Sequence, residues 1–274
     1  MIELITGAPG SGKSYFSVRL IVRSVLAGRV VVTNVPMRDD WALTLAKQGW
    51  HKWKSDQHVE ERRKRFESLV FVSDDLDEIL RVRVQGDGEG RADMVLDECH
   101  RWLNSRMWDS GIGMSKDEAT RARLKLVAFF SAHRHYGYNV YLITQNLENI
   151  DKQIRTLFEY RVSLKNLRRV KVLGMPLFPV NVFVALRFWN DTAKTKISVS
   201  SFGLDKSIAN LYSTHALAAV DHPEDAIWMP GHNEAPGGPD GRAHGAQAPP
   251  HVPPAPSRPQ AARPPLPPPG VPQP

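Results

Sequence analysis

Residues 7–14 have the residue types and the spacing that can hold phosphate groups. They read Gly7, Ala8, Pro9, Gly10, Ser11, Gly12, Lys13 and Ser14, which fits the pattern G-x-x-x-x-G-K-[ST]. The glycines let successive backbone N–H groups turn inward around an anion, and a helix starting here adds its positive end. Lys13 can reach the β- and γ-phosphates, while the Ser14 hydroxyl can ligate Mg²⁺. The segment predicts a P-loop (Walker A motif) that binds ATP with Mg²⁺; its residues contact phosphates and not the base, so GTP stays open as the nucleotide.

Two adjacent carboxylates follow a short apolar run at residues 94–96, as in a Walker B segment. We expect Asp97 to hold Mg²⁺ and Glu98 to act as the general base that polarises an attacking water. An apolar strand ending in Asp is common in proteins, so the signal depends on the P-loop upstream. The second carboxylate favours hydrolysis over transfer to a small molecule.

A glutamine ends another apolar run, at residues 140–144. Gln145 can sense the γ-phosphate or hold the lytic water, and the alternative is that it only caps the following helix. This order of segments is that of P-loop ATPases with an additional strand between the P-loop strand and the Walker B strand.

Arg134 and Arg155 flank this strand, and each is a candidate arginine finger acting on the site of a neighbouring subunit. A surface or structural role is the alternative for each. His133 and His135 lie beside Arg134, but no carboxylate or cysteine spacing completes a metal site with them. We therefore expect structural or subunit-contact roles for the histidines.

Apolar runs of strand length alternate with helical patterns through the first 165 residues, which predicts an α/β fold with a parallel sheet. A helix is predicted at 14–27 with Gly28 at its C-terminal cap, and another at 116–136. The predicted strands cover residues 2–6, 30–34, 69–72, 94–96 and 140–144.

The composition divides the chain into three parts. Residues 1–165 are predicted to form the ATPase core, with a basic, Trp-rich insertion of unassigned fold at 37–66. Residues 166–221 are predicted to add a small β extension and a short helix at 207–220. Of the 21 prolines, 17 lie after position 222, so 222–274 are predicted to be a disordered Pro-rich tail. Neither a secretory signal nor a transmembrane segment is expected.

Positive charge is in excess: residues 1–221 carry 33 Lys and Arg against 25 Asp and Glu. Such an excess favours anionic partners, and single-stranded DNA and an anionic membrane surface both remain candidates. Five cations without an acid occur in 161–171, with an ordinary solvated face as the alternative; they are Arg161, Lys165, Arg168, Arg169 and Lys171. The single cysteine, Cys99, excludes an intramolecular disulfide.

Several of these segments together resemble the zonular occludens toxin (Zot) family, which includes the filamentous-phage morphogenesis ATPases. The resemblance covers roughly residues 1–200 and combines a generic P-loop with more specific stretches. Those stretches are Val-Thr-Asn-Val-Pro at 32–36, Asp-Glu-Cys-His-Arg-Trp-Leu-Asn-Ser-Arg at 97–106, and His-Arg-His-Tyr-Gly at 133–137 leading into Thr144 and Gln145.

The resemblance implies an oligomeric phage motor that uses ATP to assemble and extrude single-stranded DNA virions through the host envelope. Its implied partners are phage assembly, export and coat proteins. It also implies the roles given above for residues 7–14, Asp97, Glu98 and Gln145. Family members typically carry a membrane-spanning helix after the ATPase domain, at the host inner membrane. The corresponding place here has no spanning segment, which favours a protein of the host cytoplasm attached peripherally to that membrane.

Two other functions stay open at this point. The basic excess favours a DNA-translocating ATPase, whose hydrolysis single-stranded DNA would stimulate. A non-hydrolysing scaffold would bind ATP and recruit coat or export proteins without turnover. A small-molecule kinase is disfavoured, because no lid of clustered arginines over the P-loop is evident.

Overall fold

One eight-stranded sheet organises the chain in the computed structural model, which describes residues 1–48, 55–84, 88–104, 106, 115–169, 171–172, 175–176, 178, 180–190 and 196–212. The Pro-rich tail predicted at 222–274 lies outside the described residues. Trp50 and Trp53 of the predicted insertion lie outside them as well.

The strand order of the sheet is β10-β9-β6-β1-β5-β4-β2-β3. The strands from β6 to β3 in this order are parallel to their neighbours, while β9 and β10 continue the sheet antiparallel. Strand β5 lies between β1 and β4, which confirms the additional strand predicted between the P-loop and Walker B strands. The strands are β1 (Ile2–Thr6), β2 (Val30–Thr33), β3 (Val70–Val72), β4 (Ala92–Leu96), β5 (Tyr138–Thr144), β6 (Tyr160–Asn166), β9 (Val182–Trp189) and β10 (Lys196–Gly203), with a separate pair β7 (Lys171–Val172) and β8 (Met175–Pro176).

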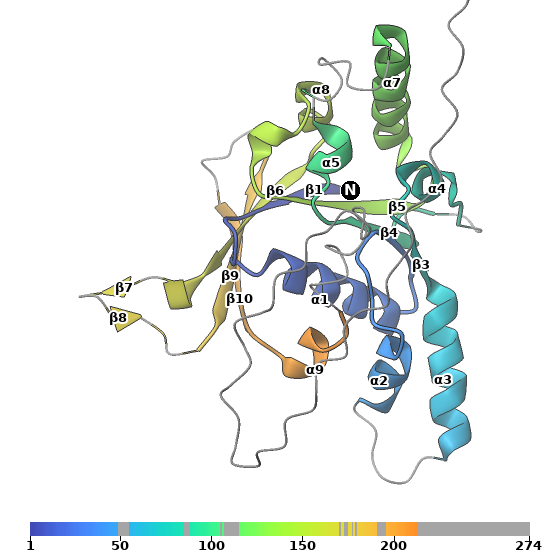
Figure 1. Cartoon of the computed structure of the whole chain (residues 1–274), viewed down its shortest axis with the longest axis vertical. Helices are drawn as coiled ribbons and strands as arrows, with labels where there is room; N and C mark the ends of the chain where they lie inside the picture. Colours follow the sequence, from blue (N-terminus) through green and yellow to red (C-terminus); the bar gives the residue numbers. More distant parts are fainter. Residues whose placement is uncertain are drawn as a thin grey trace, which may run out of the picture. The chain divides into compact units, whose positions relative to one another are not determined.

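Helices cover both faces of the sheet (Figure 1). One face packs against α1 (Lys13–Leu26), α2 (Trp41–Lys47), α3 (Asp56–Leu69) and α9 (Lys206–Ala209). The other packs against α4 (Leu76–Arg81), α5 (His100–Leu103), α7 (Lys116–Ala132) and α8 (Lys152–Arg155).

Alternating side chains of each strand enter the two cores, as a sheet buried on both faces requires. In β1, Leu4 packs on the α7 side and Ile5 on the α1 side. In β5, Leu142 and Ile143 divide in the same way. Both faces are therefore largely apolar, although Glu3 in β1 and Asp93 in β4 are buried charged residues within strands.

Helix α1 begins directly at the end of the predicted P-loop. Gly12 occupies its N-cap position with φ of 92°, a left-handed conformation that favours glycine. The helix ends at Leu26, and Gly28 follows with φ of 73°, which confirms the predicted glycine cap. The first turn of α1 is thus fixed to the loop after β1, and its positive end faces that loop.

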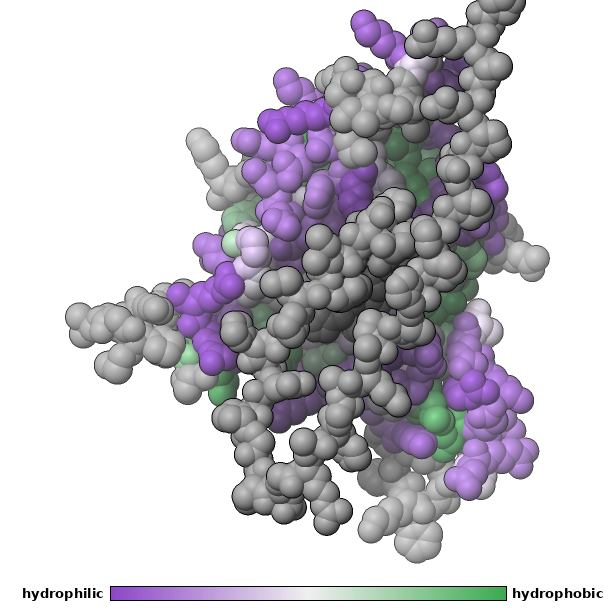
Figure 2. All heavy atoms as spheres, viewed as in Figure 1, coloured by the Kyte–Doolittle hydropathy of each residue, from purple (hydrophilic) through white to green (hydrophobic). Residues whose placement is uncertain are grey.

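The predicted insertion at 37–66 contains α2 and most of α3, whose folds the sequence left unassigned. Helix α3 is strongly hydrophilic, and Figure 2 shows it as a hydrophilic strip. Phe66 is buried in the core and ties the helix to the sheet. The insertion therefore extends the α1 layer.

Two helix predictions were too long. The helix predicted at 116–136 ends at Ala132, because a turn at 133–137 with Gly137 in a left-handed conformation leads directly into β5. The helix predicted at 207–220 comprises only Lys206–Ala209 before a turn, and residues 213–220 lie outside the described residues. The short helix α9 begins with the Asp205 side chain accepting from the Ser207 N–H.

Within the predicted β extension, β9 and β10 form an antiparallel hairpin. Because β9 pairs with β6, the hairpin continues the main sheet. It brings Asn181, Phe183 and Leu204 to the edge where the P-loop lies.

Candidate functional site

A cavity of about 450 Å³ lies at the carboxyl ends of β1, β4 and β5. Parallel strands present their carboxyl ends at one edge of a sheet, which is where α/β proteins bind ligands. The cavity is lined by Pro9, Gly10, Gly12, Lys13, Ser14, Tyr15, Glu98, Gln145, Asn166, Asn181, Phe183, Leu204 and Tyr212. The structure thus brings the P-loop, the Walker B glutamate and the predicted glutamine into one place.

The P-loop wraps around the Lys13 side chain at the start of α1. The Lys13 Nζ donates to the Gly7 carbonyl at 2.9 Å and to the Ala8 carbonyl at 3.5 Å, and the residue is 7% exposed. Gly10 and Gly12 both have positive φ, at 72° and 92°. This geometry turns loop N–H groups and one ammonium toward the same cavity, which suits a polyphosphate.

Gly12 is required for a second reason besides its φ. A Cβ atom at this position would overlap the ring of Phe183, which comes from β9. The hairpin strand thus packs directly on the P-loop, and a larger residue at this position would require Phe183 or the loop to shift.

Asp97 and Ser14 form the candidate Mg²⁺ site. Asp97 is 3% exposed at the end of β4. Burial raises the pKa of its carboxyl, and the Glu98 charge adds to this, while a hydrogen bond from the Ser14 hydroxyl and the Lys13 charge lower it. A hydroxyl and a carboxylate are hard oxygen ligands of the kind that Mg²⁺ prefers, and a cation here would offset the cost of the buried charge. These residues therefore fit the ion.

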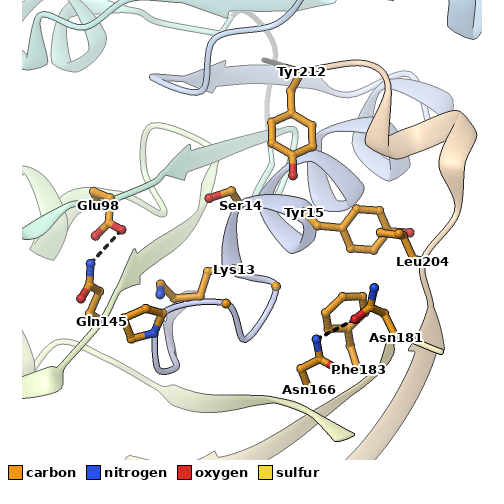
Figure 3. A pocket seen from close by; sticks show the side chains of 13 residues that line it. Lys13, Ser14, Tyr15, Glu98, Gln145, Asn166, Asn181, Phe183, Leu204 and Tyr212 are labelled. Atoms are coloured by element: carbon orange, nitrogen blue, oxygen red, sulfur yellow. Dashed lines mark hydrogen bonds between the residues drawn. The ribbon is translucent and has the colours of Figure 1, made fainter. Parts of the chain in front are cut away.

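Glu98 and Gln145 point toward one another on one side of the cavity (Figure 3). The Gln145 Nε2 donates to Glu98 Oε1 at 3.4 Å, and the other oxygen, Oε2, lies 3.2 Å from His100 Nδ1. Glu98 has φ of 46° and is the one non-glycine residue with positive φ in the described part of the chain. Such a conformation costs roughly 1–3 kcal/mol and is typical of functional sites. It aims the carboxylate into the cavity beside the Walker B aspartate.

Asn34, from the end of β2, holds the Walker B turn in place. Its side-chain amide donates to the Asp97 carbonyl at 2.9 Å and its oxygen accepts from the Asp97 N–H at 2.8 Å. Asn34 is 2% exposed, so both bonds are shielded from water. Its role is to fix the backbone that carries Asp97 and Glu98.

We expect Asn34→Ala to lower the free energy of unfolding by about 1–3 kcal/mol, because the buried Asp97 N–H and carbonyl lose their partners. Urea unfolding followed by circular dichroism measures the change. The exposed amide variant Gln57→Ala on α3 is the control and should change stability by less than about 0.5 kcal/mol. Equal stability of the two variants would show that Asn34 does not support the turn.

The wall of the cavity opposite Glu98 comes from residues that the sequence analysis did not single out (Figure 3). Tyr15 and Phe183 stack with ring centroids 5.5 Å apart, and the Tyr15 hydroxyl donates to the Gly203 carbonyl at 3.3 Å. Asn166 Nδ2 donates to Asn181 Oδ1 at 3.1 Å. Aromatic and amide groups arranged in this way can contact the nucleoside part of a nucleotide.

Tyr212 completes this wall from the last described segment. Its hydroxyl points into the cavity toward Ser14 (Figure 3). Burial and the nearby Asp97 charge raise the pKa of the Tyr212 hydroxyl, so it stays protonated and can donate a hydrogen bond. No local pattern in the sequence marks Tyr212, because only its pairing with Met37 brings it here.

Comparison of the sequence with known families shows which family the chain belongs to. The sequence model of the zonular occludens toxin (Zot) family matches residues 1–218. The chain belongs to the Zot family. Its curated relatives include the Gene 1 protein of Enterobacteria phage I2-2, 26% identical over 172 residues, and that of Enterobacteria phage fd, 29% identical over 170 residues. These matches cover 62% of the Zot-family chain but only 42% and 43% of the relatives, so it spans less than half of their length.

Solved structures similar to the Zot-family chain include the N-terminal domain of zonular occludens toxin from Neisseria meningitidis. That match has 18% identity and a TM-score of 0.37, and it covers 77% of this chain and 98% of the other. The genome packaging NTPase of Sulfolobus turreted icosahedral virus 2 matches with 12% identity and a TM-score of 0.35, covering 75% and 97%. The strand order and the Walker motifs show that the Zot-family chain has the α/β fold of a P-loop NTPase of the additional-strand type.

The two predicted finger arginines of the Zot-family chain do not line the cavity. Arg134 precedes β5 at the amino edge of the sheet and pairs with Glu159 at 2.6 Å. Arg155, at the end of α8, donates to the Ile150 carbonyl at 2.7 Å and thereby stabilises its own loop. Within one chain the structure does not bring either arginine to Lys13, and an action on a neighbouring subunit stays a prediction.

His133 has the structural role that the sequence favoured. Its Nδ1 bonds the Phe130 carbonyl at 2.6 Å and its Nε2 lies 2.9 Å from the Met1 amino group. Burial lowers the pKa of His133, so the ring is neutral at pH 7. Among the described residues no cluster of His, Cys, Asp and Glu could hold a metal ion by itself. The described helices also include none that is long and apolar enough to cross a bilayer.

Proposed function

We propose that this Zot-family chain is an ATP-hydrolysing motor that drives assembly and extrusion of filamentous phage virions carrying single-stranded DNA. The observation that carries the proposal is the convergence of Lys13, Ser14, Glu98 and Gln145 on one cavity, with Asp97 behind them. A site built only to bind phosphate needs the loop and the lysine. The glutamate paired with a glutamine is the part suited to activating water.

The chemistry follows from the positions of these groups. The loop N–H groups and the Lys13 ammonium bind the β- and γ-phosphates of ATP. Glu98 accepts a proton from a water that Gln145 orients, and the new bond forms between the water oxygen and the γ-phosphorus. The bond from the γ-phosphorus to the β–γ bridging oxygen breaks, which releases ADP and inorganic phosphate. Ser14 and Asp97 would hold Mg²⁺, which neutralises charge on the phosphate oxygens when bound.

The phage role is supported by family membership and by the Gene 1 relatives from phages. In this proposal the chain is a homo-oligomer that works with phage assembly, export and coat proteins. It acts from the host cytoplasm at the inner membrane, where a membrane partner holds it peripherally. The positive excess in residues 1–221 supports an anionic partner, which is single-stranded DNA or a lipid surface.

Asp97→Asn tests whether ATP hydrolysis at this site drives virion assembly. We expect at least a tenfold loss of Mg²⁺-dependent ATP hydrolysis, because the neutral amide is a far weaker ligand for a hard cation. Virion release from host cells carrying the variant should fall with it. Asp77→Asn is the matched control, since Asp77 lies exposed on α4 and pairs with Lys125.

Two outcomes would contradict the proposal. If Asp97→Asn abolished hydrolysis but left virion output normal, ATP hydrolysis at this site would not drive assembly. If it left hydrolysis unchanged, Asp97 would not be a ligand of the catalytic Mg²⁺. The same assay run with single-stranded DNA tests the second candidate, a DNA-translocating ATPase, which the basic excess favours. Stimulation that weakens as salt rises would support translocation of DNA by the chain itself.

A further inference from the structure

Arg169 lies directly on the P-loop although it is far from the loop in sequence. It ends the short 3-10 helix η2 (Leu167–Arg169), which follows β6. Its guanidinium donates to the Pro9 carbonyl and occupies the space that a Cβ at Gly10 would take. The contact is made within one chain, across the sheet neighbours β1 and β6.

The arginine lines a cavity that adjoins the one holding the Walker residues. A second cavity of about 460 Å³ is lined by Gly10, Asn166, Arg168, Arg169 and Asn181. Gly10, Asn166 and Asn181 also line the main cavity, so the two spaces meet at the middle of the P-loop. Phosphates held by the loop would therefore lie within reach of the guanidinium.

The negative charge at the site with a bound triphosphate would exceed the positive charge of Lys13, and Arg169 would help to balance it. Among the described residues that line the main cavity, Lys13 is the one cation, against Glu98 and the adjoining Asp97. A triphosphate with one Mg²⁺ adds about two further negative charges, and hydrolysis concentrates charge on the γ-phosphate and the leaving oxygen. Arginine suits this need, because its planar group carries five N–H donors and binds phosphate in a forked geometry.

The donors of Arg169 are also largely unused. In the part of the chain that the structure describes, its one hydrogen-bond acceptor is the Pro9 carbonyl. That bond fixes the position of the group next to Gly10 and leaves the other N–H groups for an anion.

We propose that Arg169 is a phosphate-contacting catalytic residue that acts in cis, on the nucleotide bound by its own subunit. The inference rests on the proposed ATP hydrolysis. It gives Arg169 a role within its own subunit, distinct from the action on a neighbouring subunit that the sequence predicts for Arg134 or Arg155. Arg169 neutralises the γ-phosphate as the bond to the leaving oxygen breaks.

Arg169→Ala tests the proposal in the full chain. We expect kcat for ATP hydrolysis to fall about 10- to 100-fold, the worth of a charge-assisted hydrogen bond at the reacting group. The affinity for ATP should fall more than the affinity for ADP. Arg65→Ala is the matched control, because Arg65 is also exposed and also lies against a glycine, Gly28, at the opposite edge of the sheet.

Comparing the affinities for ATP and ADP shows whether Arg169 contacts the γ-phosphate or only positions the P-loop. An equal loss of affinity for both nucleotides would show that Arg169 only shapes the P-loop through Pro9, and would overturn the proposal. Values equal to those of Arg65→Ala would overturn it as well. The binding ratio can be read in a chain that binds ATP without turnover, so failure of the motor proposal is distinguishable from failure of this one.

Oligomers that mix two variants show whether Arg169 acts on the nucleotide of its own subunit (in cis) or of a neighbouring subunit (in trans). Subunits with Arg169→Ala are combined with subunits carrying Lys13→Ala. Action in cis predicts no recovery of hydrolysis, because neither kind of subunit has a complete site. Recovery would show that Arg169 serves a neighbouring subunit and would overturn the assignment in cis.

Discussion

Glu98→Gln is expected to lower ATP hydrolysis by about 10²- to 10⁴-fold, the usual contribution of a general base, while ATP binding stays close to that of the wild type. Glu98 faces Gln145 and the cavity, and the loop contacts that would hold the phosphates do not involve it. The amide of the variant can still pair with Gln145 and can occupy the same backbone conformation. It cannot accept the proton from water. Phosphate release and nucleotide binding are measured on the same preparation.

The exposed glutamate Glu61, on α3, supplies the control variant Glu61→Gln. It should leave both hydrolysis and binding unchanged. Hydrolysis by Glu98→Gln at the wild-type rate would remove the general base from the mechanism and favour a nucleotide-dependent scaffold. Loss of binding together with hydrolysis would instead place Glu98 among the groups that hold the nucleotide.

Lys13→Ala is expected to weaken ATP binding by about 10²- to 10⁴-fold, because contacts to two phosphate groups are lost and each is a charge-assisted hydrogen bond. Hydrolysis should then fall below detection. The substitution removes the donor to the Gly7 and Ala8 carbonyls, but alanine keeps the helix propensity of the first turn of α1. Isothermal titration with ATP measures the loss, and circular dichroism confirms that the fold is kept.

Lys47→Ala is the matched control, since Lys47 is an exposed lysine in the last turn of α2. Its affinity for ATP should equal that of the wild type. Equal affinity of Lys13→Ala and Lys47→Ala would contradict the assignment of residues 7–14 as the phosphate site.

The sequence could predict those parts of the site whose residues lie close together in the chain. The P-loop carries its fixed residues within 7–14, directly between a strand and a helix. The Walker B carboxylates and Gln145 each follow an apolar run, and parallel strands necessarily bring these run ends together. The order β1-β5-β4 is the one expected of P-loop ATPases with an additional strand, and the structure has it.

The opposite wall could not be predicted, because no local pattern marks it. Phe183 and Asn181 reach the P-loop only because β9 turns back antiparallel along β6. Tyr212 reaches it through an isolated bridge to Met37. In the sequence Arg169 is one of five cations in a basic run, and nothing there distinguishes it from Arg161, which instead donates to the Asn190 side chain.

The arginine-finger candidates show that closeness in sequence to the site does not place a side chain at the site. Arg134 stands close to the strand that ends in Gln145, but it precedes that strand and so lies at its amino end. Closeness in sequence to a functional strand does not tell which edge of the sheet a side chain occupies. Arg134 instead pairs with Glu159, whose carboxylate also lies 3.7 Å from the Met1 amino group.

The most direct test of the account is phosphate release from ATP by the purified chain with Mg²⁺, with and without single-stranded DNA and with the oligomeric state recorded at each concentration. The account predicts turnover that Glu98→Gln removes and that Lys13→Ala abolishes together with binding. Tight ATP binding without turnover in every oligomeric state, with DNA or without it, would contradict the motor and leave a nucleotide-dependent scaffold.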